Sequence, residues 1–99
     1  MKIRWTQRGI DSLESIVDYI AADSEYYAGR LAEGILHSLE ILKNYPQLGR
    51  VVPEFNQPSI RELIYHNYRI VYKIEQQTII VLLVSHGMQI LPNIPYNEN

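Results

Sequence analysis

An unbroken apolar run near the C-terminal end limits the folds that are available to this chain. Residues 78–84 read Thr-Ile-Ile-Val-Leu-Leu-Val, without the polar residue at every second position that marks a strand with one solvated face. An apolar run of strand length is typical of a strand that is covered on both faces. We therefore expect a central strand at 78–85, with other parts of the chain packed against each side of it.

Three further strands are predicted. The segments 60–65 and 68–74 are separated by a short His-Asn turn, and a second turn, Glu-Gln-Gln, leads into the apolar run. These segments therefore predict two consecutive hairpins. Residues 1–5 alternate between charged and apolar side chains, which predicts a short first strand with one buried face.

Two amphipathic helices are predicted between the first strand and the others. Thr6 is an N-cap residue for a helix that ends near Ala22, and Asp23 or Ser24 offers the next N-cap. The apolar residues of the first helix are Ile10, Leu13, Ile16, Val17 and Ile20, and those of the second are Ala28, Leu31, Ile35, Leu39 and Leu42. Pro46 disfavours further helix, and the short connection predicts an antiparallel hairpin.

The order of these segments is β-α-α-β-β-β. It predicts an α+β fold, in which the N-terminal strand and the antiparallel helical hairpin pack on one face of a twisted, mainly antiparallel C-terminal sheet. The connection at 46–58 contains three prolines and is expected to be ordered but irregular, with Val51-Val52 as a strand fragment. We expect one domain over residues 1–99, with a tail at 91–99 that either stays flexible, packs on the domain or docks on a partner.

Composition excludes several classes of protein. The 99 residues contain no cysteine, which excludes a disulfide framework, a Cys-ligated metal and a thiol nucleophile. His37, His66 and His86 lack local ligand spacing, so we expect neither a metal nor a cofactor. There is no apolar run of about 18 residues and no secretion signal, so we expect a cytoplasmic protein without a membrane partner. The net charge of -2 argues against binding to nucleic acid through bulk electrostatics.

Tyrosine is unusually frequent, with eight residues against one phenylalanine. Tyr68 and Tyr72 share a strand face with Ile70 and Ile74, so we assign both rings to the core. The tyrosines near helix ends and turns either contact a partner or cover the edge of the core, and they are Tyr19, Tyr26, Tyr27, Tyr45 and Tyr65.

Short motifs in both halves of the chain occur in a recognisable order. In the first half these are Trp5-Thr6, Asp18-Tyr19-Ile20-Ala21, Lys43-Asn44-Tyr45-Pro46 and Leu48-Gly49-Arg50. In the second half they are Arg61-Glu62-Leu63, Tyr68-Arg69-Ile70-Val71-Tyr72 and Val84-Ser85-His86-Gly87. Their joint order and spacing resemble the RelE/ParE superfamily of toxins, and the similarity extends over about residues 3–90.

The resemblance implies the toxin of a type II toxin-antitoxin module, which a cognate antitoxin neutralises by direct binding. ParE-like members of the superfamily poison DNA gyrase and have no established hydrolytic chemistry. RelE-like members are ribosome-dependent endoribonucleases that cleave mRNA in the A site. A third alternative is an inactive member that serves only as an antitoxin-binding module.

The choice between nuclease and gyrase poison depends on a few residues. Metal-independent RNA cleavage requires a base, an acid and cations for the phosphate, and the resemblance points to Arg61, Arg69 and His86. Alternatively, Arg69 pairs with a carboxylate such as Glu62 on the neighbouring strand, and His86 ends the last strand. No tyrosine or basic residue follows His86 directly, the region 50–60 lacks lysine, and the protein is acidic. These departures favour the ParE-like branch and a toxin without catalytic residues.

Two interaction surfaces are expected. The resemblance places the gyrase contacts on the strands at 68–74 and 78–85 and on the tail at 86–99. The candidate target-binding residues are Arg50, Arg61, Arg69, His86 and Met88. An antitoxin segment is expected to fold onto the helical hairpin and the first strand, as a helix or an added strand. The candidate antitoxin-binding residues are Ile10, Leu13, Val17, Tyr27, Arg30, Leu31, Glu33 and His37.

Overall fold

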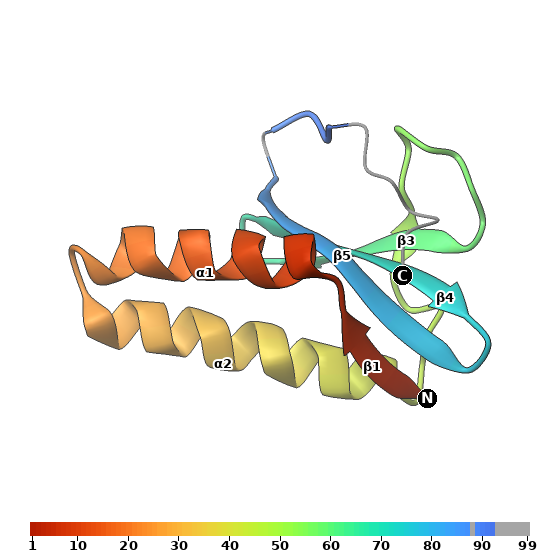
Figure 1. Ribbon diagram of the computed structural model, residues 1–99, viewed down its shortest axis with the longest axis horizontal. Helices are drawn as coiled ribbons and strands as arrows, with labels where there is room; N and C mark the ends of the chain where they lie inside the picture. Colours follow the sequence, from red (N-terminus) through yellow and green to blue (C-terminus); the bar gives the residue numbers. More distant parts are fainter. Residues whose placement is uncertain (88, 93–99) are drawn as a thin grey trace.

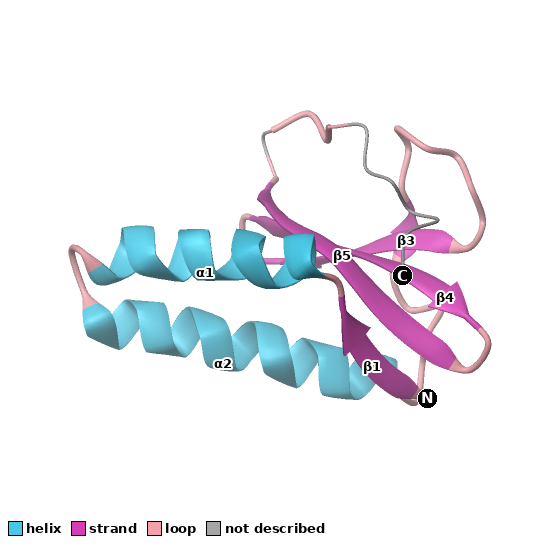
Figure 2. Ribbon diagram, in the orientation of Figure 1, coloured by secondary structure: helices cyan, strands magenta, loops and turns pink. Residues whose placement is uncertain are grey.

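The computed structural model describes residues 1–87 and 89–92 of the chain. Its elements are β1 (Lys2–Trp5), α1 (Gln7–Ala21), α2 (Glu25–Leu42), β2 (Arg50–Val51), β3 (Ile60–Tyr65), β4 (Tyr68–Glu75) and β5 (Thr78–His86). The two helices run side by side as a hairpin, and β1 leads directly from the sheet into α1 (Figure 1). Helices and strands form separate layers, which confirms the predicted α+β fold (Figure 2).

The five strands form one sheet in the order β1-β5-β4-β3-β2. β1 pairs in parallel with the first half of β5, from Lys2 opposite Thr78 to Trp5 opposite Val81, and the other pairs are antiparallel. Beyond Val81, the first turns of α1 take the place of β1 along the edge of β5. There Thr6 donates its hydroxyl proton to the carbonyl oxygen of Val81 at 3.0 Å, and the Val84 N–H donates to Ser12 Oγ at 2.9 Å.

The apolar run of β5 supplies both faces of the sheet, as predicted. Ile79, Val81 and Val84 pack in the cluster under the helices, whereas Ile80, Leu82 and Leu83 pack in a second cluster on the opposite face. Two neighbouring residues share that second face because the register with β4 shifts: Val81 lies opposite Tyr72 and Leu83 opposite Val71. This β-bulge accommodates a continuous apolar run where strict alternation would not.

The face opposite the helices is covered by the connection between β2 and β3 and by the chain that follows β5. Val52 is fully buried there, Phe55 packs beside it, and Leu91 is 6% exposed in the same cluster. The connection predicted to be irregular is therefore a second covering layer. Its strand fragment is β2, which pairs with β3.

Helix formation follows the predicted capping. Thr6 Oγ1 accepts the Gly9 N–H at 3.0 Å, as predicted, and Ser24 Oγ accepts the Tyr27 N–H at 3.2 Å. Of the two candidates for the second cap, Asp23 and Ser24, the structure therefore has Ser24. The apolar stripe of α2 is buried, with Ile35 and Leu42 fully buried. None of the helices in the described part of the chain is long and apolar enough to span a bilayer.

Tyr72 lies in the core, as predicted, whereas Tyr68 is only partly buried. The hydroxyl of Tyr72 donates to the carbonyl oxygen of Pro46 at 2.7 Å and accepts the Gly49 N–H at 3.0 Å. Burial raises the pKa of this hydroxyl above its ordinary value. Tyr72 therefore fastens the turn after α2 to the sheet.

Candidate functional site

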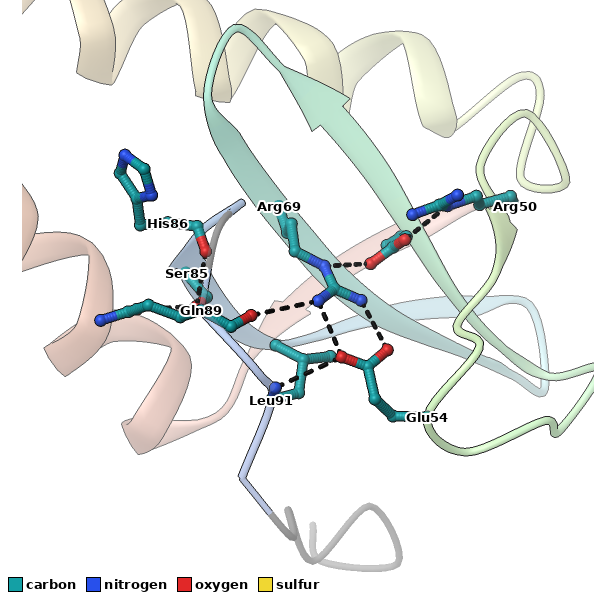
Figure 3. Close-up of polar contacts among 8 residues, drawn as sticks. Arg50, Glu54, Arg69, Ser85, His86, Gln89 and Leu91 are labelled. Atoms are coloured by element: carbon teal, nitrogen blue, oxygen red, sulfur yellow. Dashed lines mark hydrogen bonds and ion pairs between the residues drawn. The ribbon is translucent and has the colours of Figure 1, made fainter.

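An arginine and carboxylate network lies on the sheet face opposite the helices (Figure 3). Its centre is Glu62 of β3, whose side chain is fully buried. Glu62 accepts hydrogen bonds from the Nε atoms of Arg69 on β4 and Arg50 on β2, each at 2.5 Å. Strand register explains this arrangement, since Arg50 lies directly opposite Glu62 and Arg69 is its diagonal neighbour on β4. The predicted pairing of Arg69 with Glu62 is confirmed.

Glu54 completes the network from the loop between β2 and β3. Its two carboxylate oxygens accept hydrogen bonds from Nη1 and Nη2 of Arg69, both at 2.8 Å, which makes a bidentate ion pair. These hydrogen bonds from Arg69 hold the pKa of Glu54 at about 2, well below its usual range. The same contacts with Glu54 and Glu62 raise the pKa of Arg69.

The network leaves Arg69 poorly suited to bind a phosphate. Its side chain is 7% exposed, and all three of its nitrogen atoms donate to carboxylates. The two arginines, Arg50 and Arg69, balance the charges of Glu54 and Glu62, so the network carries no net charge.

His86 lies on the other face of the sheet from Arg69. It is paired with Tyr68, whereas Arg69 is paired with Ser85, so successive side chains of the two strands point to opposite faces. The His86 ring packs edge-on against Tyr68 at 5.7 Å and lines a hollow with Ser12 and Tyr19 of α1. In Figure 3 its imidazole points away from the Arg69 guanidinium.

Arg61 is directed elsewhere again. It lies opposite Tyr72, and its Nη1 donates to the carbonyl oxygen of Gly49 at 2.9 Å. The three candidates for RNA cleavage, Arg61, Arg69 and His86, therefore do not converge on a common point. These three described residues are therefore not placed to act together as the acid, base and phosphate-binding cation of RNA cleavage.

The remaining target-binding candidates differ in exposure. The Arg50 side chain is 63% exposed beside its ion pair with Glu62, and His86 is exposed at the end of β5. Arg69 is buried, so it offers little surface to a partner. Met88 and the tail residues 93–99 lie outside the described residues.

Most antitoxin-binding candidates lie on the outer surface of the helical hairpin. Those classed as exposed are Ile10, Tyr27, Arg30, Glu33 and His37. Leu13 and Val17 are partly buried on α1. Leu31 is 9% exposed and packs in the core under the helices, because it belongs to the buried stripe of α2.

Two hollows accompany α2. One, of about 490 Å³, is lined by Tyr27 and Arg30 together with Tyr65 and Tyr68 of the sheet. The other, of about 410 Å³, is lined by His37 and Leu36 of α2 and by Ile3 and Trp5 of β1. Both place apolar or aromatic surface beside charged groups, as protein interfaces do.

Sequence reasoning missed Leu36, which is 49% exposed, and left Tyr26 between partner contact and the edge of the core. Tyr26 is 64% exposed, and its hydroxyl accepts a hydrogen bond from Arg30 at 2.9 Å. Their position outside the buried stripe of α2 is the signal that identifies them. Glu54 was also missed, because nothing in an irregular loop indicates which strand its side chain reaches. Among the described residues, no three His, Asp or Glu side chains are grouped to hold a metal ion.

Comparison with known proteins agrees with this architecture. Residues 3–91 match the family model described as ParE toxin of type II toxin-antitoxin system, parDE. A protein of Sinorhizobium fredii named "Putative toxin Y4kP" is 33% identical over 95 residues, which cover 94% of this chain and 95% of that protein.

A solved structure shares the fold. A chain of the chromosomal ParDE toxin-antitoxin system from P. aeruginosa superposes with a TM-score of 0.71 at 19% identity, covering 87% of this chain and 95% of the other. A chain of the RelBE2 toxin-antitoxin complex from Mycobacterium tuberculosis has a TM-score of 0.49 at 21% identity, covering 86% and 88%. On the family match and the Sinorhizobium relative, this chain belongs to the ParE toxins of type II toxin-antitoxin systems, within the RelE/ParE superfamily.

Proposed function

We propose that this toxin arrests growth by inhibiting DNA gyrase and that a cognate antitoxin neutralises it by binding the helical hairpin. The observation that carries the gyrase proposal is the placement of Arg69 and His86 on opposite faces of the sheet. The nuclease alternative would use both residues on one phosphate, and Arg69 is already paired with two carboxylates. Inhibition by protein contact needs no such convergence.

The proposed target surface lies at the end of β5 and the adjoining start of β4. His86 provides an exposed polar group at this end, and the tail continues from it. Arg50 is exposed on the opposite face of the sheet, where it lines a hollow with Arg69 and Gly87. Deleting residues 91–99 is expected to leave a folded protein with reduced toxicity, measured as growth after induction and checked by circular dichroism. Full toxicity of the shortened chain would remove the tail from the target surface.

The proposed antitoxin surface is the outer face of α2 with its two hollows. Tyr27 is 67% exposed and Leu36 is 49% exposed, and Arg30, Glu33 and His37 supply charged or polar groups between them. An amphipathic antitoxin segment would cover these apolar side chains and pair with the charges around them. Addition of antitoxin is therefore expected to slow amide exchange within residues 8–45, and unchanged exchange there would contradict this surface.

The gyrase assay tests the activity itself. Purified toxin is added to gyrase and relaxed plasmid, with and without antitoxin, and both supercoiling and cleaved DNA are scored. Loss of supercoiling or accumulation of cleaved DNA, reversed by antitoxin, is the expected result. Unperturbed gyrase from a preparation that still arrests growth would favour A-site mRNA cleavage, and a preparation that also permits growth would favour an inactive antitoxin-binding module.

A further inference from the structure

The network around Arg69 joins three segments that are distant in the sequence. Glu54 comes from the loop between β2 and β3, Arg69 comes from β4, and the main chain of residues 89–91 follows β5. The Leu91 N–H donates to Glu54 Oε2 at 3.3 Å, and Arg69 Nη1 donates to the carbonyl oxygen of Gln89 at 3.4 Å. Both bonds are long, but they act on adjacent parts of the same short segment.

Other contacts hold the same segment. The Gln89 N–H donates to the carbonyl oxygen of His86 at 3.0 Å, and Ser85 Oγ lies 3.1 Å from Gln89 Oε1. The Leu91 side chain is buried against the cluster that contains Val52 and Phe55. The chain after β5 is therefore fixed to the far face of the sheet by polar contacts on its backbone and by one apolar anchor.

Glu54 is the residue on which this attachment depends. The same carboxylate oxygen, Oε2, accepts both Arg69 Nη1 at 2.8 Å and the Leu91 N–H. Its other oxygen accepts a hydrogen bond from Arg69 Nη2, so Arg69 fixes the orientation of the carboxylate that the Leu91 N–H contacts. Removing Glu54 would take away the polar contact to Leu91 and free Arg69 from its bidentate pair, so the segment would be held only by its weaker contacts and by the Leu91 side chain.

We propose that Glu54 and Arg69 are positioning residues, which set the direction in which the chain leaves the sheet after Leu91, and that toxicity depends on this direction. This inference rests on the proposed function, in which the C-terminal end contacts the target. Arg69 then acts through the segment it holds and not by touching the target. Ordering the backbone of one residue costs on the order of tenfold in affinity, so a detached segment predicts at least about tenfold weaker inhibition.

The test compares Glu54→Ala with Glu75→Gln in the full chain. Glu75 pairs with Lys73 at 2.8 Å near the opposite end of β4, so its variant removes the same charge and breaks an ion pair away from the segment. Amide exchange at Leu91 and at residues 79–83 is measured for each protein, together with growth arrest and the toxin concentration that half-inhibits gyrase.

In Glu54→Ala, the Leu91 amide is expected to exchange at least about tenfold faster while residues 79–83 stay protected, and half-inhibition is expected to require at least about tenfold more toxin. Glu75→Gln is expected to match the wild type in both readouts. Unchanged protection of Leu91, or lost protection with unchanged inhibition, would overturn the proposal. If Glu54→Ala does not fold, Leu91→Ser removes the apolar anchor without changing a charge and is judged by the same two readouts.

The experiment distinguishes a failure of this positioning role from a failure of the gyrase proposal. If the wild-type toxin arrests growth but leaves gyrase unperturbed, the gyrase assignment fails, and growth arrest becomes the readout for the two variants. Equal growth arrest by Glu54→Ala and wild type would then overturn the positioning role whatever the target is.

Discussion

Replacing Arg69 by methionine tests whether this arginine is a structural or a target-binding residue. Methionine keeps an unbranched side chain but leaves Glu62, whose carboxylate is fully buried, beside Arg50, whose side chain is 63% exposed. Glu54 loses both bonds of its bidentate pair in the same step. Removing one partner of a buried ion pair costs about 3–5 kcal/mol. Here the loss falls on two carboxylates, because Glu62 keeps only the largely exposed Arg50 and Glu54 keeps no arginine.

That cost is a large fraction of the stability of a small domain, which is about 5–15 kcal/mol. For a chain of this size, 1 kcal/mol corresponds to roughly 4–8 °C in Tm, so Arg69→Met is expected to lower the Tm by at least about 12 °C. Urea denaturation gives the free energy of unfolding for the wild type and for the variant. Glu40→Gln is the control, since its ion pair with Lys43 is largely exposed and contributes about 0–1 kcal/mol.

A second substitution sharpens the interpretation. Adding Glu62→Gln to Arg69→Met removes the buried carboxylate charge that Arg69 no longer balances, so the double variant is expected to recover part of the lost stability. The double-mutant cycle formed with the two single variants measures the coupling energy between Arg69 and Glu62. A cost below about 1 kcal/mol for Arg69→Met, combined with lost toxicity, would refute this reasoning. Arg69 would then be a surface residue that contacts the target.

Three further predictions concern stability. The pKa of Glu54 is lowered from 4.5 to about 2 in the folded protein, so the stability that Glu54 contributes is complete above pH 4.5 and is lost as the pH falls toward 2. Glu54→Gln should therefore flatten the pH dependence of the urea midpoint between these two values. Gly9→Ala places a Cβ 2.5 Å from the Val81 carbonyl oxygen, so α1 must move away from β5, and thermal denaturation should show a loss of about 1–3 kcal/mol. Tyr72→Phe removes both hydrogen bonds to the turn at 46–49 and should cost about 1–3 kcal/mol, with faster amide exchange confined to that turn.

The fold was predictable wherever the signal is local. Thr6 and Ser24 cap their helices through bonds that span three residues, and the hairpins around β4 follow from short polar turns. The bulge opposite Val71 was not predicted, because a bulge depends on how two strands pair. The covering of the far face by Phe55 and Leu91 was likewise hidden, since an irregular loop has no period from which a buried side can be read.

The candidate site was also predictable only where its contacts are local in the sequence. The pairing of Arg69 with Glu62 was predicted because the two residues lie on adjacent strands of one hairpin. Their third partner, Glu54, reaches the site from an irregular loop, and no pattern in the sequence specifies its direction. The separation of His86 from Arg69 depends on the register between β4 and β5, which a bulge shifts by one residue.

The resemblance pointed to Arg69 as one of the candidates for RNA cleavage, and its ion pairs with Glu54 and Glu62 compete with such a role. A phosphate that approached Arg69 would have to displace Glu54, which already makes two bonds of 2.8 Å with the guanidinium. The exchange replaces one charge-assisted pair by another, so the arginine provides little net gain in affinity. It would also leave a carboxylate beside the incoming phosphate, with like charges repelling each other. Even an Arg69 released from Glu54 would have no help from His86, because His86 lies on the opposite face of the sheet and packs against Tyr68. The same side chains that stabilise the far face of the sheet therefore argue against phosphate binding by Arg69.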